Sequence, residues 1–345
     1  MNTLTFPFAD APKTDGELID VAPGIKWLRM PLPLALNHIN LYLIRDNDGW
    51  MIVDTGLATE RTRELWQKII TEKLAGERIT GVICTHFHFD HAGLAGWLTE
   101  WLRVPLYMSY GEYYTLRVVA AEKGDEVPWE HQEFFRHAGF SAEALAEVMI
   151  VVRMAHGLIT PPPASFRRLR HGERLMIGER EWHLHVGEGH APEHMLLHCP
   201  QDNLLIAGDQ LLPRITSNVG IRPSEPEADL LAYWFASLDN LALLPADTLV
   251  LPAHELPYYG LVPRVAQLHV HHEQQFVKIR KLCTERALSA YETAVALFPT
   301  RKNSMDDLMA MGECLAHLTH LRKRGEITRT LGADGVYYFR TGTPT

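Results

Sequence analysis

Short apolar runs separated by turn residues open the chain, and runs of this length are typical of β-strands. They are Ile25–Met30, Ile39–Ile44 and Trp50–Val53, followed by the turn Asp54-Thr55-Gly56. Between Thr59 and Leu74 the apolar positions follow a helical period, and Ile79–Thr85 is again rich in strand-forming residues. A second helical pattern covers Ala92–Leu102. The first part of the chain is therefore predicted to be a β-meander followed by helix, strand and helix.

Residues 109–160 differ in character from what precedes them. Their spacing is mostly helical, they carry many aromatic side chains, and they end in Pro161-Pro162-Pro163, so we interpret them as a helical insert. Strand patterns return afterwards, at Arg174–Ile177, Glu181–Val186, Met195–Cys199, Leu204–Ile206 and Thr248–Leu251. A helix is expected between about Glu227 and Leu244. The second half thus repeats the strand and helix patterns of the first.

The C-terminal part is predicted to be a small domain of its own. Helical spacing resumes at Pro263 and predicts a helix over Ser304–Arg324. The runs Ile327–Leu331 and Val336–Arg340 flank Ala333-Asp334-Gly335, as in a β-hairpin. The two predicted domains are a large one that contains the insert and a small one that begins with a helical linker, residues 1–262 and 263–345.

Composition excludes several classes of protein. With 345 residues, 46% hydrophobic and 22% charged, the chain is neither disordered nor collagen-like nor a coiled coil. No apolar run approaches the roughly 20 residues that span a bilayer, and the N-terminal segment lacks the pattern of a signal peptide, so a cytoplasmic protein without a membrane partner is expected. The net charge of −9 disfavours nucleic-acid binding. Four separated cysteines indicate buried thiols instead of a zinc cluster or disulfides.

A histidine cluster carries the strongest chemical signal among the 19 histidines. It reads Thr85-His86-Phe87-His88-Phe89-Asp90-His91, at the end of a predicted strand and the start of a predicted helix. Extended residues two apart point the same way, so His86 and His88 can bind one cation. The turn into the helix directs Asp90 and His91 to a neighbouring point. The segment predicts two metals side by side.

Three further candidate ligands follow predicted strands. They are His190 in Gly189-His190-Ala191-Pro192-Glu193-His194, Asp209 in Ala207-Gly208-Asp209, and His254 in Leu251-Pro252-Ala253-His254. Each one alone is a weak signal, because a single His or Asp at a strand end is more often a cap or a hydrogen-bonded structural residue. The order of the three residues along the chain is stronger evidence for a metal site than any one of them alone.

With these residues in this order, the sequence resembles the metallo-β-lactamase fold superfamily over roughly residues 20–260. Its H-x-H-x-D-H signature is followed by a His, an Asp and a His on separate loops. The resemblance implies one metal held by His86, His88 and His190, a second held by Asp90, His91 and His254, and Asp209 bridging the two. The bridging Asp is similar to that of glyoxalase II, N-acyl-homoserine lactonases and zinc phosphodiesterases, and true zinc β-lactamases lack it.

The fold implied is of the α+β class: an αββα sandwich of two face-to-face sheets with helices outside, a helical insert, and a small C-terminal winged-helix-like domain. Independently of the family, two divalent ions can activate water at neutral pH and polarise a carbonyl or phosphoryl oxygen. Nitrogen and oxygen ligands without thiolate favour Zn²⁺, with iron or manganese as permitted occupants. Asp90 is a candidate proton acceptor, and Asp54 a candidate acceptor for a ligand imidazole.

The predicted function is hydrolysis of a thioester, ester or lactone of a small, partly apolar acid. All three substrates are kept, because the fold alone does not choose among them. Two alternatives stay open: a zinc phosphodiesterase or ribonuclease, and a mononuclear iron dioxygenase. His194 either orients substrate or is a structural histidine behind the ligands. Aromatic and Met side chains of the insert either line an acyl pocket or pack its helices: Met108, Tyr113, Tyr114, Phe135, Met149 and Met154.

From Phe276 onward there are 11 Lys and Arg against 7 Asp and Glu. This excess is too small for a phosphate-binding stripe. We therefore expect the terminal domain to serve packing or a homodimer interface. The predicted partner of the protein is a small-molecule substrate and not a nucleic acid.

Overall fold

The computed structural model describes residues 3–33, 36–122 and 127–342. Internal contacts divide the chain into two compact units. The first unit comprises Met1–Glu122, Ala155–Ser217 and Ser237–Val265, and the second comprises Lys123–Met154, Asn218–Ala236 and Ala266–Thr345. The predicted division at residue 262 differs from this grouping, because most of the insert belongs with the C-terminal part.

The first unit contains a seven-stranded sheet in which sequence order equals spatial order. Its strands are β1 (Ile19–Ala22), β2 (Ile25–Pro31), β3 (His38–Asp46), β4 (Gly49–Val53), β5 (Ile79–Ile83), β6 (Leu106–Met108) and β7 (Arg167–Arg168). The strands from β1 to β4 pair antiparallel, as the predicted meander requires. From β4 to β7 the pairing is parallel, because helices connect these strands.

A five-stranded sheet of order β12-β11-β10-β9-β8 is the second layer of the first unit. Its strands are β8 (Arg174–Ile177), β9 (Arg180–Gly187), β10 (His194–Cys199), β11 (Leu204–Gly208) and β12 (Leu249–Pro252). Only β11 and β12 are parallel, and the helix α7 (Leu230–Leu241) lies between them in the chain. All five strands were predicted from the apolar runs.

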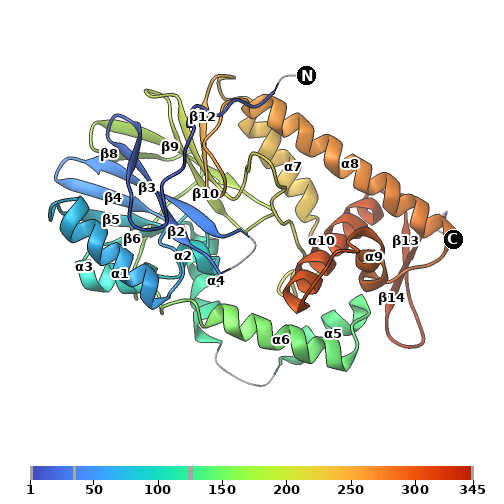
Figure 1. Ribbon diagram of the computed structural model, residues 1–345. Helices are drawn as coiled ribbons and strands as arrows, with labels where there is room; N and C mark the ends of the chain where they lie inside the picture. Colours follow the sequence, from blue (N-terminus) through green and yellow to red (C-terminus); the bar gives the residue numbers. More distant parts are fainter. Residues whose placement is uncertain (1–2, 34–35, 123–126, 343–345) are drawn as a thin grey trace. The chain divides into compact units, whose positions relative to one another are not determined.

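The two sheets pack face to face through a buried apolar layer. Trp27 and Tyr42 of the first sheet and Trp182 of the second belong to it. A second core lies on the other face of the first sheet, under α1 (Glu60–Lys68) and α3 (Ala95–Leu102); Figure 1 shows these helices beside that sheet. The predicted sandwich is confirmed. The four cysteines are buried thiols without disulfides, also as predicted.

The two predicted N-terminal helices form with local adjustments. Thr59 caps α1 by accepting the Thr62 N–H, and the helix continues as a π-helical turn over Ile69–Lys73. Trp66 fixes α1 to the sheet, because its Nε1–H donates to the Thr55 carbonyl at 2.8 Å. The second predicted helix is split into α2 (Phe89–Ala92) and α3. Helix α4 (Tyr110–Ala121) also belongs to the first unit.

The second unit is mostly helical. It contains α5 (Trp129–Ala138), most of α6 (Ala142–His156), the greater part of α8 (Leu261–Glu285), α9 (Ala290–Leu297), α10 (Ser304–Lys323), β13 (Thr328–Leu331) and β14 (Tyr337–Arg340). The ring of Phe140, between α5 and α6, lies 4.9 Å from that of Tyr291 in α9. Arg136 donates to the Asp334 carbonyl at 3.4 Å in the β13–β14 turn. The insert helices therefore pack on the C-terminal hairpin and helices.

Two buried histidines join α8 to α10 in this unit. His317 Nδ1–H donates to the Glu313 carbonyl at 2.7 Å, so its Nε2 accepts from His272 Nδ1–H at 3.0 Å. His272 Nε2 is buried and makes no hydrogen bond with any residue that the structure describes. Burial, and then the neighbouring His317, lower the pKa of His272 to about 2, and burial lowers that of His317 to about 4. Both rings therefore fold neutral.

Replacing His272 with Gln should reduce the acid sensitivity of the fold. A His whose folded pKa lies below its unfolded value of about 6.5 loses stability as pH falls through 6.5, on the order of 2 kcal/mol between pH 7 and pH 5. Thermal unfolding at the two pH values should show a smaller acid-induced drop in Tm for the variant than for the wild type. An equal drop would contradict the neutral, buried state of His272.

Candidate metal centre

The histidine cluster spans the loop after β5 and the helix α2, and Asp54 holds it in place. Asp54 follows β4 with a positive φ of 62°. Its Oδ1 accepts the Thr85 N–H at 2.7 Å, and its Oδ2 accepts from Thr85 Oγ1 and His91 Nδ1, both at 2.8 Å. The contact predicted between Asp54 and a ligand imidazole is therefore present. It leaves the Nε2 lone pair of His91 directed toward the site.

The other predicted ligands come from the second sheet, at the same edge of the sandwich. His190 lies in the loop between β9 and β10, Asp209 directly follows β11, and His254 follows β12 by two residues. Backbone hydrogen bonds join these ends to the histidine loop and to each other: Met195 N–H donates to Thr85 at 2.8 Å, and Ala253 N–H to Gly208 at 2.9 Å. The sandwich therefore brings together residues that are 168 positions apart in sequence, from His86 to His254.

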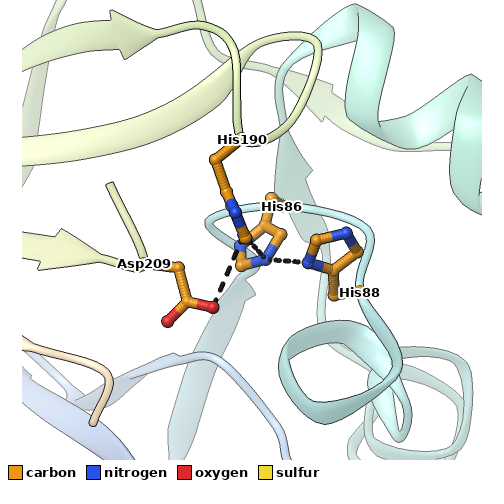
Figure 2. A group of neighbouring side chains, drawn as sticks. All are labelled: His86, His88, His190 and Asp209. Carbon is orange, nitrogen blue, oxygen red and sulfur yellow. Dashed lines mark hydrogen bonds and ion pairs between the residues drawn. The ribbon is translucent and has the colours of Figure 1, made fainter. Parts of the chain in front are cut away.

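Four of the predicted ligands form one group (Figure 2): His86, His88, His190 and Asp209. His86 Nε2 lies 2.8 Å from His88 Nδ1 and 3.3 Å from His190 Nε2. Asp209 Oδ2 lies 3.5 Å from His190 Nε2. One donor atom from each residue lies within 4.8 Å of every other, a spacing at which the group could hold a cation.

Asp90, His91 and His254 form a second group of the same kind. Asp90 Oδ2 lies 3.8 Å from His91 Nε2 and 3.6 Å from His254 Nε2. Asp209 faces this group as well, with Oδ2 at 3.4 Å from His91 Nε2 and Oδ1 at 3.3 Å from His254 Nε2. Its carboxylate therefore lies between the two groups, as a bridging ligand would.

The donor set fits divalent metal ions. Two ligands of a tetrahedral ion, each about 2.0–2.1 Å from it, lie about 3.3 Å apart, and the distances from Asp209 to His91 and His254 are close to that value. Two buried atoms at this point, His91 Nε2 and Asp209 Oδ1, make no hydrogen bond within the described residues. A buried polar atom without a partner costs free energy, which a bound cation would offset.

The electrostatics of the site favour a cation. Burial alone would lower the pKa of His91, but Asp209, Asp90 and Asp54 raise it well above the usual value. Burial would raise the pKa of Asp209, but His254 and His91 hold it well below its usual range. Burial and the surrounding imidazoles lower the pKa of His86. Asp209 thus stays ionised and His86 stays neutral, the forms that bind metals.

His194 lies behind the ligands and is fully buried. Its ring stacks on His86 with centroids 4.7 Å apart, and its Nε2 accepts the Asp209 N–H at 3.1 Å. Gly208 allows this approach, because a Cβ there would lie 2.5 Å from the imidazole. Of the two roles expected for His194, the geometry favours support of His86 and Asp209 over contact with substrate.

His38 is a functional residue that the sequence gave no signal for. Its carbonyl accepts His254 Nδ1–H at 3.0 Å, which directs His254 Nε2 toward the site, and its Nε2 accepts the Glu255 N–H at 3.0 Å. Burial and the nearby Arg29 lower the pKa of His38 to about 4. Because His38 and His254 are 216 residues apart, no local pattern could relate them.

The side chains expected to line an acyl pocket are placed differently. Tyr113 is buried, stacks on Phe166 at 3.8 Å and donates to the Pro163 carbonyl at 2.7 Å, and Met108 lies in the same core. Phe135 packs against Phe140 in the second unit. These three side chains fill cores, the alternative that the sequence left open, whereas Tyr114 and Met154 are exposed.

Comparison with known proteins agrees with the site. Residues 35–254 match the family model described as the metallo-beta-lactamase superfamily. The chain belongs to this superfamily. Residues 276–342 match a second model, the metallo-beta-lactamase-like C-terminal domain. With the fold, these matches identify the protein as a metal-dependent hydrolase of the superfamily.

Two relatives of this metallo-β-lactamase superfamily member cover most of the chain, and a third covers about half of it. The crystal structure of a beta-lactamase domain protein from Burkholderia ambifaria is 39% identical, with a TM-score of 0.88, and covers 98% of this chain and 97% of that one. The probable metallo-hydrolase YqjP of Bacillus subtilis is 23% identical over 318 residues, 90% of this chain and 96% of that protein. Human acyl-coenzyme A thioesterase MBLAC2 is 23% identical over 196 residues, 54% of this chain and 63% of that protein.

Asp209→Asn should lower the bound metal from about two ions per chain to one or fewer, because the amide removes the negative charge placed between the two groups. Metal content measured on zinc-reconstituted protein by mass spectrometry checks this. Asp48→Asn, at an exposed turn of the first sheet, is the matched control and should keep the wild-type content. A full metal complement in Asp209→Asn would argue against the bridging position.

Proposed function

We propose that this protein is a binuclear hydrolase that acts on a thioester, ester or lactone of a small, partly apolar acid. The observation that carries the proposal is the position of Asp209, whose carboxylate oxygens lie 3.3–3.5 Å from imidazoles of both ligand groups. A site built this way offers two adjacent cation positions. Nitrogen and oxygen donors without thiolate favour zinc, and they also accept iron or manganese.

Each residue of the site has a role in this proposal. His86, His88 and His190 would hold one ion, Asp90, His91 and His254 the other, and Asp209 would touch both. Bound divalent ions supply activated water at neutral pH and polarise the carbonyl of the substrate. Asp90, whose side chain is 12% exposed, is the proposed proton acceptor. Asp54 and the His38 carbonyl keep His91 and His254 in the tautomers that present Nε2.

An acyl substrate is supported by the relative named acyl-coenzyme A thioesterase, and a nucleic-acid substrate is disfavoured by the charges of the second unit. We propose that its C-terminal part, in which Leu288 and Phe339 form a bridge beside the β13–β14 hairpin, is winged-helix-like. Several arginines there pair with carboxylates: Arg322 and Arg329 with Glu227, Arg280 and Arg324 with Glu326, and Arg301 with Asp307. Cations neutralised in this way contribute little to phosphate binding.

A screen of the metal-reconstituted protein tests the substrate class. Acyl thioesters, esters, lactones, β-lactams and phosphodiesters should be assayed in parallel with the zinc-, iron- and manganese-loaded enzyme. We expect hydrolysis of a thioester, ester or lactone, and its loss by more than about 100-fold in Asp209→Asn, because an activated nucleophile needs both ions. Activity on phosphodiesters alone would support the nuclease alternative. One iron per chain with oxygen consumption would support the dioxygenase.

A further inference from the structure

A buried carboxylate on α4 contacts both of the loops that carry the His86–His88–His190 group. Glu112 is fully buried in the first turn of that helix. Its Oε2 accepts the Phe87 N–H at 2.9 Å, and its Oε1 accepts the Glu193 N–H at 2.7 Å. Phe87 stands between His86 and His88, and Glu193 stands between His190 and His194.

The contact is reciprocal, because Glu193 in turn holds the start of α4. Glu193 Oε2 accepts the Gly111 N–H at 2.8 Å, and Ser109 Oγ–H donates to the Glu193 carbonyl at the same distance. A Cβ at Gly111 would lie 3.2 Å from the Glu193 side chain, so glycine permits the close approach. Glu193 thus satisfies an N–H group at the start of α4 and closes a ring of hydrogen bonds.

The relative position of these two loops determines the distances among His86, His88 and His190. His88 and His190 each approach His86 Nε2, at 2.8 and 3.3 Å, although they come from loops on different sheets. A shift of either loop would move its nitrogens out of the range that one ion can bind. Glu112 is 25 residues from Phe87 and 81 from Glu193, and its two oxygens set the distance between the loops.

We propose that Glu112 is a positioning residue, which sets the spacing of His86 and His88 relative to His190 and so determines the affinity and ligand geometry of that metal position. The proposal rests on the metal site proposed above. A carboxylate is required because two backbone N–H groups need two acceptor atoms, and charge-assisted bonds of this kind are stronger than neutral ones. Gln has the same shape but presents an NH₂ group to one of the two N–H donors.

The test compares Glu112→Gln with the wild-type protein in metal binding. We expect the affinity for Zn²⁺, measured by competition with a chromophoric chelator, to fall about 10- to 100-fold, as is usual when a group that orients metal ligands is lost. The visible absorption spectrum of the Co²⁺-loaded variant should also change, because the spectrum reports ligand geometry and not fold stability.

Asp46→Asn is the matched control. The Asp46 carboxylate also accepts two backbone N–H groups, those of Gly178 and Asn47, but it contacts neither ligand loop through them. The control should leave the Zn²⁺ affinity and the Co²⁺ spectrum unchanged, because both N–H groups donate to Oδ1, which Asn retains. If Glu112→Gln merely lowers Tm and otherwise matches this control, Glu112 is a structural residue and the proposal is overturned.

Hydrogen exchange on the wild-type protein keeps the proposal testable if Glu112→Gln does not fold. The Phe87 and Glu193 amides should be protected before metal is added, because Glu112 accepts both. Rapid exchange of these two amides would overturn the proposal. Failure of the proposed function is distinguishable, since in that case the wild-type protein itself would fail to bind two divalent ions or to hydrolyse acyl substrates.

Discussion

Five imidazoles and two carboxylates lie close together in one largely buried site at the edge of the sandwich. The rest of the structure must offset the free-energy cost of burying these polar groups. Buried charges are costly unless they are paired. Here Asp209 faces imidazoles of both groups, and two polar atoms are left for a further partner. The apolar layers on the two faces of the first sheet contribute the free energy that offsets the cost of burying these charges.

Rigid anchoring follows from the same constraint. Neighbouring strands hold two of the ligand segments. Asp54, after β4, accepts the Thr85 N–H in the loop after β5, and the side chains of Asn40 and Tyr42 in β3 both donate to the Pro252 carbonyl, near His254. The bonds to Pro252 cross from one sheet to the other. The sandwich therefore holds ligands from four segments of the chain close to one another, as a metal site requires.

The two units differ in what they contain. The first unit carries every residue of the two ligand groups. The second comprises most of the insert, residues 218–236 and the C-terminal segment, and it contains aromatic contacts, ion pairs and the His272–His317 hydrogen bond. In residues 3–33, 36–122 and 127–342, no helix has the length and hydropathy needed to cross a membrane.

The sequence by itself determined much of this picture. Periods of two and of 3.6 residues predicted most of the strands and helices, because a sheet or a helix on an apolar core imposes those periods on its own residues. The short strands β1, β6 and β7 were not predicted. The candidate ligands were predicted from the H-x-H-x-D-H segment and from the strand-end positions of His190, Asp209 and His254. Few types of side chain can bind a metal, and the ends of neighbouring strands lie at one edge of a sheet.

Only the tertiary structure decided the rest. Three features depend on contacts between residues far apart in the chain. The insert packs on the C-terminal helices, Tyr113 fills a core, and His38 and Glu112 orient the ligands. A buried Glu has no local signature, since its partners are backbone N–H groups that every residue except proline has. Such contacts arise when strands and helices pack, and the pattern of one segment does not contain the position of another.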